Sequence, residues 1–282
     1  MTDMRAAQAS RTPGSRWQVR CAMQTDVGCV RTHNEDAVGC MIPREDDPFA
    51  RAGTLAIVAD GMGGHAAGEV ASRIALRTML HEYYRSAATP AAALEHALAL
   101  ANRAICERAA ADPACAGMGT TCSAVAIVGG LAYFAHVGDS RIYLLRGEGF
   151  RQLTEDDSLV GQMLRGGLLT AEEARAHPDR HVLLRVLGTR DFQPVVAPDG
   201  LALEDADILL LCTDGITDQI DDAMLASVLR SQAPVDACSR LIDLARMAGG
   251  LDNATVAICD LQPQPADADH AAVRSTRETR AY

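Results

Sequence analysis

Four aspartates lie where a run of apolar residues meets a glycine-containing turn, and carboxylates held in this way can bind metal ions. Asp60 follows LAIVA and Asp214 follows ILLLCT, while Asp139 follows YFAHVG and Asp252 lies shortly before TVAIC. If the four carboxylates converge, bound cations or raised pKa values must relieve their repulsion. Oxygen ligands without a His/Cys pattern favour hard cations, so the pattern predicts Mg²⁺ or Mn²⁺ over zinc. Asp-Gly pairs also occur in simple turns, which explains any one of these positions better than all four.

Two further stretches carry residues suited to phosphate chemistry. Asn34, Glu35 and Asp36 add polar and acidic groups close to Arg31, whose planar guanidinium matches a phosphate group. His65, in GMGGHAAGE, precedes an expected helix and has a side chain that can transfer a proton near neutral pH. Taken alone, each stretch is more typical of a solvated loop or an ordinary helix start.

The composition narrows the classes of protein to which the chain can belong. Its 282 residues fit one globular domain with a sizeable core. All 26 basic residues are arginine, which excludes Schiff-base lysines, the P-loop lysine and the kinase lysine. The net charge of −11 argues against a nucleic-acid or anionic-membrane binder, so we expect neither partner.

The cysteines and the lack of long apolar runs indicate the cellular compartment in which we expect the protein. Nine cysteines without a CxxC pair indicate free thiols in a reducing environment. The Cys-x5-Arg loop of thiol-dependent phosphatases is absent as well. Because the N-terminus has no apolar signal segment and no apolar run reaches about 18 residues, we expect a soluble, cytoplasmic protein.

The hydrophobic pattern predicts short strands, some joined by hairpins, with helices between them. Residues 1–15 and 263–282 are polar and aperiodic, so we expect mobile ends around a single domain at 16–262. Gly129-Gly130 indicates a hairpin. Strands are predicted at 17–24, 54–59, 121–128, 131–136, 141–145, 208–212 and 255–260, and helices at 66–84, from 90 to about 105, and at 234–248. This order favours antiparallel sheets covered by helices, an α+β fold, over a parallel βαβ fold.

Residues 154–190 interrupt the pattern. They contain glycine pairs and a capping box from Thr170 to Glu173, with only short helical pieces. An insertion of this size in a strand-rich domain is often a lid over a functional site.

Taken together, these segments resemble the metal-dependent Ser/Thr protein phosphatases of type 2C, in the bacterial form of the family. The resemblance covers about residues 17–260 in the family's order and spacing. The matching segments are VRTHNEDAVG (30–39), VADGMGGHAAGEVAS (58–72), GMGTTCSAV (117–125), FAHVGDSRIYLLR (134–146), LTEDDSLV (153–160), AHPDRHVLLRVLG (176–188), LLLCTDGITD (209–218) and GGLDNATVAI (249–258). One DGMGG alone would be a weak signal, whereas the ordered series is highly specific.

The resemblance implies a four-layer αββα sandwich, in which helix pairs flank two central antiparallel sheets and two to three Mn²⁺ or Mg²⁺ ions bind at one end. It implies that the metal-site residues are Asp36, Asp60, the carbonyl of Gly61, Asp139, Asp214 and Asp252. Asp60 would bridge two ions, and Asp139 with Asp214 would hold the third. Glu35 and Asn253 would support these ligands, and residues 154–190 match the family's flap beside the active site.

The implied activity is hydrolysis of phosphoserine and phosphothreonine by direct attack of a metal-bridging water. Two divalent ions lower the pKa of such a water towards about 7, while Arg31 would grip the substrate phosphate. His65 is the candidate for protonating the leaving oxygen, although eukaryotic members have histidine directly after Asp-Gly, where this chain has Met62. Asp157 likewise stands where many relatives have histidine.

The implied partners are phosphorylated proteins, among them a bacterial Ser/Thr kinase that the enzyme opposes, and the protein is expected to be a monomer. Two other classes compete with this interpretation. A haloacid-dehalogenase-type phosphatase needs Asp-x-Asp after a strand, which neither Asp60-Gly61-Met62 nor Asp214-Gly215-Ile216 supplies. A non-catalytic phosphoprotein-binding module on the same fold would not need intact metal carboxylates, and the chain retains them.

Overall fold

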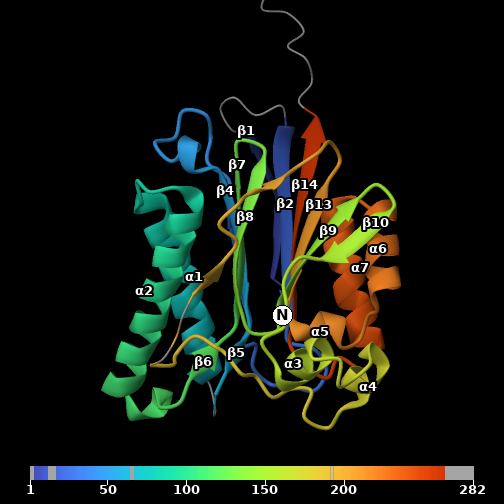
Figure 1. Cartoon of the computed structure of the whole chain (residues 1–282). Coiled ribbons are helices and arrows are strands. Elements are labelled where there is room, and N and C mark those ends of the chain that lie inside the picture. The colour runs from blue at the N-terminus through green and yellow to red at the C-terminus, as the bar shows by residue number, and fades with distance from the viewer. Residues whose placement is uncertain (1–2, 12–16, 64–66, 191, 193, 264–282) are drawn as a thin grey trace, which may run out of the picture.

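The fold is built on two antiparallel sheets packed face to face (Figure 1). The computed structural model describes residues 3–11, 17–63, 67–190, 192 and 194–263. Sheet A has the order β1 (Asp3–Arg11), β2 (Trp17–Asp26), β14 (Ala254–Pro263), β13 (Ile208–Cys212), β9 (Arg141–Arg146) and β10 (Gly149–Gln152). Sheet B has the order β11 (Val195–Val196), β8 (Leu131–Val137), β7 (Cys122–Val128), β4 (Thr54–Ala59) and β3 (Ala37–Met41), and β12 (Leu201–Ala202) also pairs with β8.

Helices cover the outer face of each sheet, which gives the expected αββα layers (Figure 1). Helices α1 (Ala67–Arg85) and α2 (Pro90–Ala111) pack on sheet B, and α6 (Asp222–Ser231) and α7 (Pro234–Met247) pack on sheet A. At one end of the sandwich lie the short elements α3 (Leu159–Arg165), α4 (Ala171–Ala176), α5 (Asp214–Thr217), β5 (Gly61–Met62) and β6 (Gly119–Thr120). Two 3₁₀ turns, Ala50–Ala52 and Pro113–Cys115, complete the described elements.

The apolar runs in the sequence follow from this layering. All six residues of β4 are buried, because the strand has sheet A on one face and the α1–α2 pair on the other. Alternate residues of each central strand therefore enter different cores. In β4, Ala56 and Val58 face the core between the sheets, whereas Leu55 and Ile57 face the helices. A run such as LAIVA is the pattern of a strand covered on both faces.

The main strands and long helices were predictable from local pattern. Strand β4, strand β13 and the start of α7 lie at their predicted positions. Gly129 and Gly130 form the β7–β8 turn with φ of 58° and 84°, a left-handed geometry that favours glycine. The capping box at Thr170 and Glu173 is confirmed at the start of α4. No helix in the described part of the chain is long and apolar enough to cross a membrane.

The N-terminal boundary differs from expectation. Residues 3–11, which the polar composition assigned to a mobile end, form strand β1 and pair with β2. Without β1, strand β2 would be the edge of sheet A, with one row of its backbone groups unpaired by the sheet. Backbone pairing of this kind needs no apolar pattern, so composition does not reveal it. Of the predicted mobile tail at 263–282, residue 263 ends strand β14, and residues 264–282 lie outside the described residues, as do residues 12–15.

Candidate metal centre

The four aspartates predicted as ligands converge at the end of the sandwich that carries the short elements. Strands β4, β8 and β13 end there, and β14 begins there. Asp60 follows β4, Asp139 lies in the turn after β8, and Asp214 starts α5 directly after β13 and Thr213. Together with Asp252, just before β14, they line a pocket of about 370 Å³. Antiparallel pairing thus brings together carboxylates that are up to 192 residues apart (252 − 60).

The backbone around Asp60 is fixed by neighbouring strands. Its N–H donates to Thr121 Oγ1 (2.9 Å), and its carbonyl oxygen accepts from Thr120 Oγ1 (2.8 Å). The next residue must be glycine, because a Cβ on Gly61 would lie 2.1 Å from the carbonyl oxygen of Gly68 in α1. Helix α1 therefore packs directly against the backbone that follows Asp60, and Gly61 lines the pocket.

Asp36 lies beneath this pocket, just before β3, and is 8% exposed. Its Oδ2 accepts a hydrogen bond from Thr213 Oγ1 at 2.9 Å. Its other carboxylate oxygen, Oδ1, is buried without a hydrogen-bond partner, and so is Oδ1 of Asp214. A buried polar atom without a partner costs about 1–3 kcal/mol, and more if it is charged. Two such oxygens in one acidic cluster are free to act as ligands.

Burial first, and then repulsion between neighbouring acids, raises the pKa values of the carboxylates in this cluster. Burial, with a smaller contribution from Asp214 and Asp252, raises the pKa of Asp36 to about 7. Burial, with Asp218 and Asp252, raises the pKa of Asp214 to about 6. Burial and neighbouring carboxylates also raise the pKa values of Asp60 and Asp139 well above their usual range. The site therefore holds protons that hard cations would displace, and its all-oxygen donors suit Mg²⁺ or Mn²⁺.

Asn253 fixes the loop that carries the acidic residues Glu35 and Asp36. Its side chain is nearly buried and accepts from the Glu35 N–H (2.8 Å). Its amide nitrogen donates to the carbonyl oxygens of Val27 (3.0 Å) and His33 (2.9 Å). Burial raises the pKa of Glu35, and the nearby Arg31 opposes that shift. Glu35 and Asn253 both line the pocket that holds the aspartates.

Arg31 lies at the mouth of the pocket. Its side chain is 53% exposed, and Nη2 lies 2.8 Å from Oδ2 of Asp252. The guanidinium is therefore held beside the carboxylates and still open to solvent, where it can meet an incoming phosphate. His65, the expected proton donor, lies outside the described residues.

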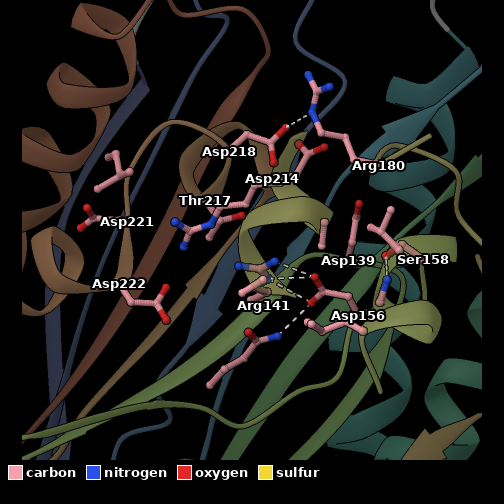
Figure 2. A pocket seen from close by; sticks show the side chains of 18 of the residues that line it. Asp139, Arg141, Asp156, Ser158, Arg180, Asp214, Thr217, Asp218, Asp221 and Asp222 are labelled. Carbon is pink, nitrogen blue, oxygen red and sulfur yellow. Dashed lines mark hydrogen bonds and ion pairs between the residues drawn. The ribbon is translucent and has the colours of Figure 1, made fainter. Parts of the chain in front are cut away.

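A second cavity of about 660 Å³ adjoins the metal pocket and shares Asp139 and Asp214 with it (Figure 2). The inserted segment 154–190, through α3 and α4, forms one wall of this cavity, and the start of α6 forms another. Figure 2 shows Arg141 paired with Asp156 and Arg180 paired with Asp218 across it. The segment thus lies beside the site, as a flap would.

Sequence reasoning missed several residues of the site. His181 from the inserted segment and Leu183 line the metal pocket, and possible ligand atoms of His181, Asp214 and Asp218 lie within 4.8 Å of one another. Asp218 could have been found, since it follows Asp214 by one helical turn and both face the same side. His181 had no comparable signal, because its position depends on how the inserted segment folds back.

Asp157 joins the inserted segment to the turn that carries Asp139. Its side chain is 3% exposed, pairs with Arg185, and accepts from the Gly138 N–H at 3.3 Å. Its own N–H donates to the Gly138 carbonyl at 2.7 Å. Asp157 therefore holds the base of the inserted segment against the turn that follows strand β8.

Replacing Asp157 with alanine is expected to lower the free energy of unfolding by about 2 kcal/mol, because a buried charge-assisted hydrogen bond is lost. Hydrogen exchange at residues 158–185 should accelerate, since this anchor of the flap is gone. Urea denaturation and exchange mass spectrometry would measure both effects. Glu172→Ala, an exposed acid of the same segment, is the control, and equal behaviour of the two variants would contradict the anchoring role.

An αββα sandwich with a cluster of carboxylates at one end is the arrangement expected of the metal-dependent protein phosphatases, and the comparisons with known proteins agree with it. The family model described as Protein phosphatase 2C matches residues 32–247. Protein phosphatase PhpP of Streptococcus pneumoniae is 38% identical over 253 residues, which cover 87% of this chain and 99% of that protein. This chain belongs to the protein phosphatase 2C family.

Solved structures agree with this assignment. The Mycobacterium tuberculosis serine/threonine phosphatase PstP/Ppp has a TM-score of 0.78 at 36% identity, covering 86% of this chain and 99% of that one. A structure of the catalytic domain of PstP in complex with 2 manganese ions has a TM-score of 0.76 at 34% identity, covering 86% and 98%. These likenesses bear out the predicted family and fold class.

Proposed function

We propose that this chain is a Mn²⁺- or Mg²⁺-dependent phosphatase that hydrolyses phosphoserine and phosphothreonine in proteins. The observation that carries the proposal is the convergence of buried and half-buried carboxylates that repel one another, two of which leave an oxygen without a hydrogen-bond partner. The family and its manganese-containing relative support it. The residues assigned to two or three cations are Asp36, Asp60, the Gly61 carbonyl, Asp139, Asp214 and Asp252.

The chain's own residues prepare the site for a phosphate dianion. When bound, divalent cations supply acidified water for the hydrolysis and neutralise charge on phosphate. Arg31 would leave its pair with Asp252 and donate two hydrogen bonds to phosphate oxygens, which a planar guanidinium does well. We assign protonation of the leaving serine or threonine oxygen to His65. Glu35 and Asn253 hold the loop of Arg31 in place through the 2.8 Å hydrogen bond between them.

The function is tested by the release of phosphate from a phosphothreonine peptide. We expect Mn²⁺-dependent release that EDTA abolishes and that excess Mn²⁺ restores. A phosphotyrosine peptide of the same sequence is the control. Binding of the phosphopeptide without any release would support a non-catalytic binding module instead.

Arg31→Ala is expected to raise KM about 10-fold or more, because a charge-assisted bidentate contact with phosphate is lost, with a smaller effect on kcat. Arg31→Lys should recover part of the loss, since a lysine keeps the charge without the fork. Steady-state kinetics on the phosphothreonine peptide would measure both variants. Unchanged KM and kcat in Arg31→Ala would show that the phosphate is bound elsewhere.

We infer that the protein acts as a cytoplasmic monomer and removes phosphate groups that a bacterial Ser/Thr kinase adds to proteins. The bacterial protein phosphatases among the relatives support this setting. Comparison of phosphoproteomes from a deletion strain and its parent would identify the substrates. The setting would be wrong if no phosphoserine or phosphothreonine site gained occupancy in the deletion strain.

A further inference from the structure

Three thiols from three different strands meet in the core between the sheets. Cys21 on β2 and Cys259 on β14 are directly opposite each other in the antiparallel ladder, and their Sγ atoms lie 2.8 Å apart. Cys40 on β3 belongs to the other sheet and packs against the same core. The three Sγ atoms all lie within 4.8 Å of one another. We call these residues the thiol trio.

The geometry of the trio suits a disulfide better than a metal ion. Opposing residues of an antiparallel pair have Cα atoms about 4.5–5.5 Å apart, within the range that disulfides span. A bond of about 2.05 Å requires the sulfurs of Cys21 and Cys259 to approach by only about 0.8 Å from their present 2.8 Å. Sulfurs that share one tetrahedral ion at about 2.3 Å would instead have to be about 3.8 Å apart.

Cys40 is the least buried member of the trio. Strand β3 is an edge strand of sheet B, and Cys40 is half-buried, whereas Cys21 and Cys259 are 4% and 0% exposed. Hydrogen bonds from Cys21 and Cys259 lower the pKa of Cys40 to about 5. The thiolate is the form of cysteine that peroxides attack, and redox-sensitive cysteines combine a low pKa, access and a neighbouring thiol.

We propose that the thiol trio is an oxidative modification site, at which a peroxide converts Cys21 and Cys259 into a cross-strand disulfide by way of Cys40. The Cys40 thiolate takes one oxygen from hydrogen peroxide, forming a sulfenic acid and releasing hydroxide. One thiol of the facing pair attacks that sulfur, forming a mixed disulfide and releasing water. The other thiol of the pair then displaces Cys40 from the mixed disulfide. The peroxide is reduced by two electrons, the pair is oxidised by two, and Cys40 ends as a free thiol.

The disulfide would join strands at the two ends of the domain. Cys21 and Cys259 are separated by 238 positions in the chain, so their bond closes nearly the whole domain into one loop. A cross-link over a long loop restricts the unfolded chain strongly. Oxidation is therefore expected to raise resistance to urea, and the site lies in the core, away from the phosphatase pocket.

The test treats the Mg²⁺-loaded protein with hydrogen peroxide and follows thiols by alkylation and mass spectrometry. We expect the number of alkylated cysteines under denaturing conditions to fall from nine to seven, and a Cys21–Cys259 linked peptide to appear. Cys40→Ala should slow its formation at least about 10-fold, because the reactive thiolate is lost. Cys238→Ala, which removes a buried thiol of the helix-facing core, is the matched control and should react like the parent.

The urea concentration at which half of the protein is unfolded provides a second measurement, which reports stability and not the rate of disulfide formation. It should rise on oxidation of the parent and of Cys238→Ala and return after dithiothreitol. It should rise less in Cys259→Ala, in which only the much shorter Cys21–Cys40 loop can close. The proposal is overturned if all nine thiols stay free, if oxidation ends at a sulfinic acid or links another pair, or if Cys40→Ala reacts at the parent rate. None of these outcomes bears on the phosphatase activity, which is measured separately.

Discussion

Asp214→Asn is expected to lose at least about 100-fold in Mn²⁺-stimulated phosphatase activity while keeping its fold. Even partners behind metal ligands cost 10–100-fold when they are removed, so a ligand itself should cost no less. Asparagine keeps the size of the side chain and removes the charge. The Oδ1 of Asp214 that lacks a hydrogen-bond partner would then be neutral, and binding of the cation would weaken.

Stability should change in the opposite direction from activity. Asp60 is repelled by Asp214, Asp36 and Asp139, so removing one of these charges relieves the free protein. In EDTA at neutral pH we therefore expect Asp214→Asn to unfold at the parent's urea concentration or above it. Asp60→Ala should lose Mn²⁺-stimulated phosphatase activity as Asp214→Asn does.

Asp222→Asn is the matched control, because Asp222 lines the larger cavity but not the metal pocket. We expect it to keep most of its activity. Steady-state assays over a range of Mn²⁺ concentrations and urea denaturation in EDTA would measure the set. Full activity of Asp214→Asn at every Mn²⁺ concentration would remove Asp214 from the metal site.

The stability of the metal-free protein should fall as pH rises from about 4 to about 7. The folded pKa values of Asp36 and Asp214 are about 7 and about 6, against an ordinary 3.8, so the folded state holds protons that the unfolded chain has released. Stability falls with pH wherever the folded state binds more protons, by about 1.4 kcal/mol per pH unit for each extra proton. The raised pKa values of Asp60 and Asp139 act in the same direction.

Saturating Mg²⁺ should remove this decline, because cations take the place of the protons. The stabilisation that Mg²⁺ gives, measured against EDTA, should therefore grow between pH 5 and about 8. Urea denaturation at several pH values with and without Mg²⁺ would show it. Asp214→Asn in EDTA should have a shallower decline than the parent. A flat profile of the EDTA-treated parent between pH 4 and 7 would contradict the protonated carboxylates.

The convergence of Asp60, Asp139, Asp214 and Asp252 could be predicted from sequence because each lies beside a core strand and a glycine. Asp60 is the clearest case, since all of β4 is buried and Gly61 is required by the packing of α1. The roles of Asp157 and His181 could not be predicted, because both depend on how residues 154–190 fold back on β8. The hydrogen bond between Asp36 and Thr213 joins residues 177 positions apart, which no local pattern reveals.

The shortest strands escaped prediction for a related reason. Strands β11 and β12 have two residues each and exist only because β8 offers them an edge. Strand β1 likewise depends on β2. Elements that bury an apolar face have a hydrophobic pattern that can be recognised in the sequence, whereas elements formed by backbone pairing alone have none.

The place of β14 has a consequence for how the protein is made. This strand, the last in the described part of the chain, lies between β2 and β13, so sheet A cannot be completed on a growing chain until residue 263 has left the ribosome. Asp252, which lies just before β14, also emerges late. Domains fold as units during synthesis, and here a nascent or prematurely terminated chain lacks both the central strand and part of the acidic pocket. We therefore expect phosphatase activity only after the whole domain has been synthesised. Chains that end before β14 should be inactive and open to proteolysis.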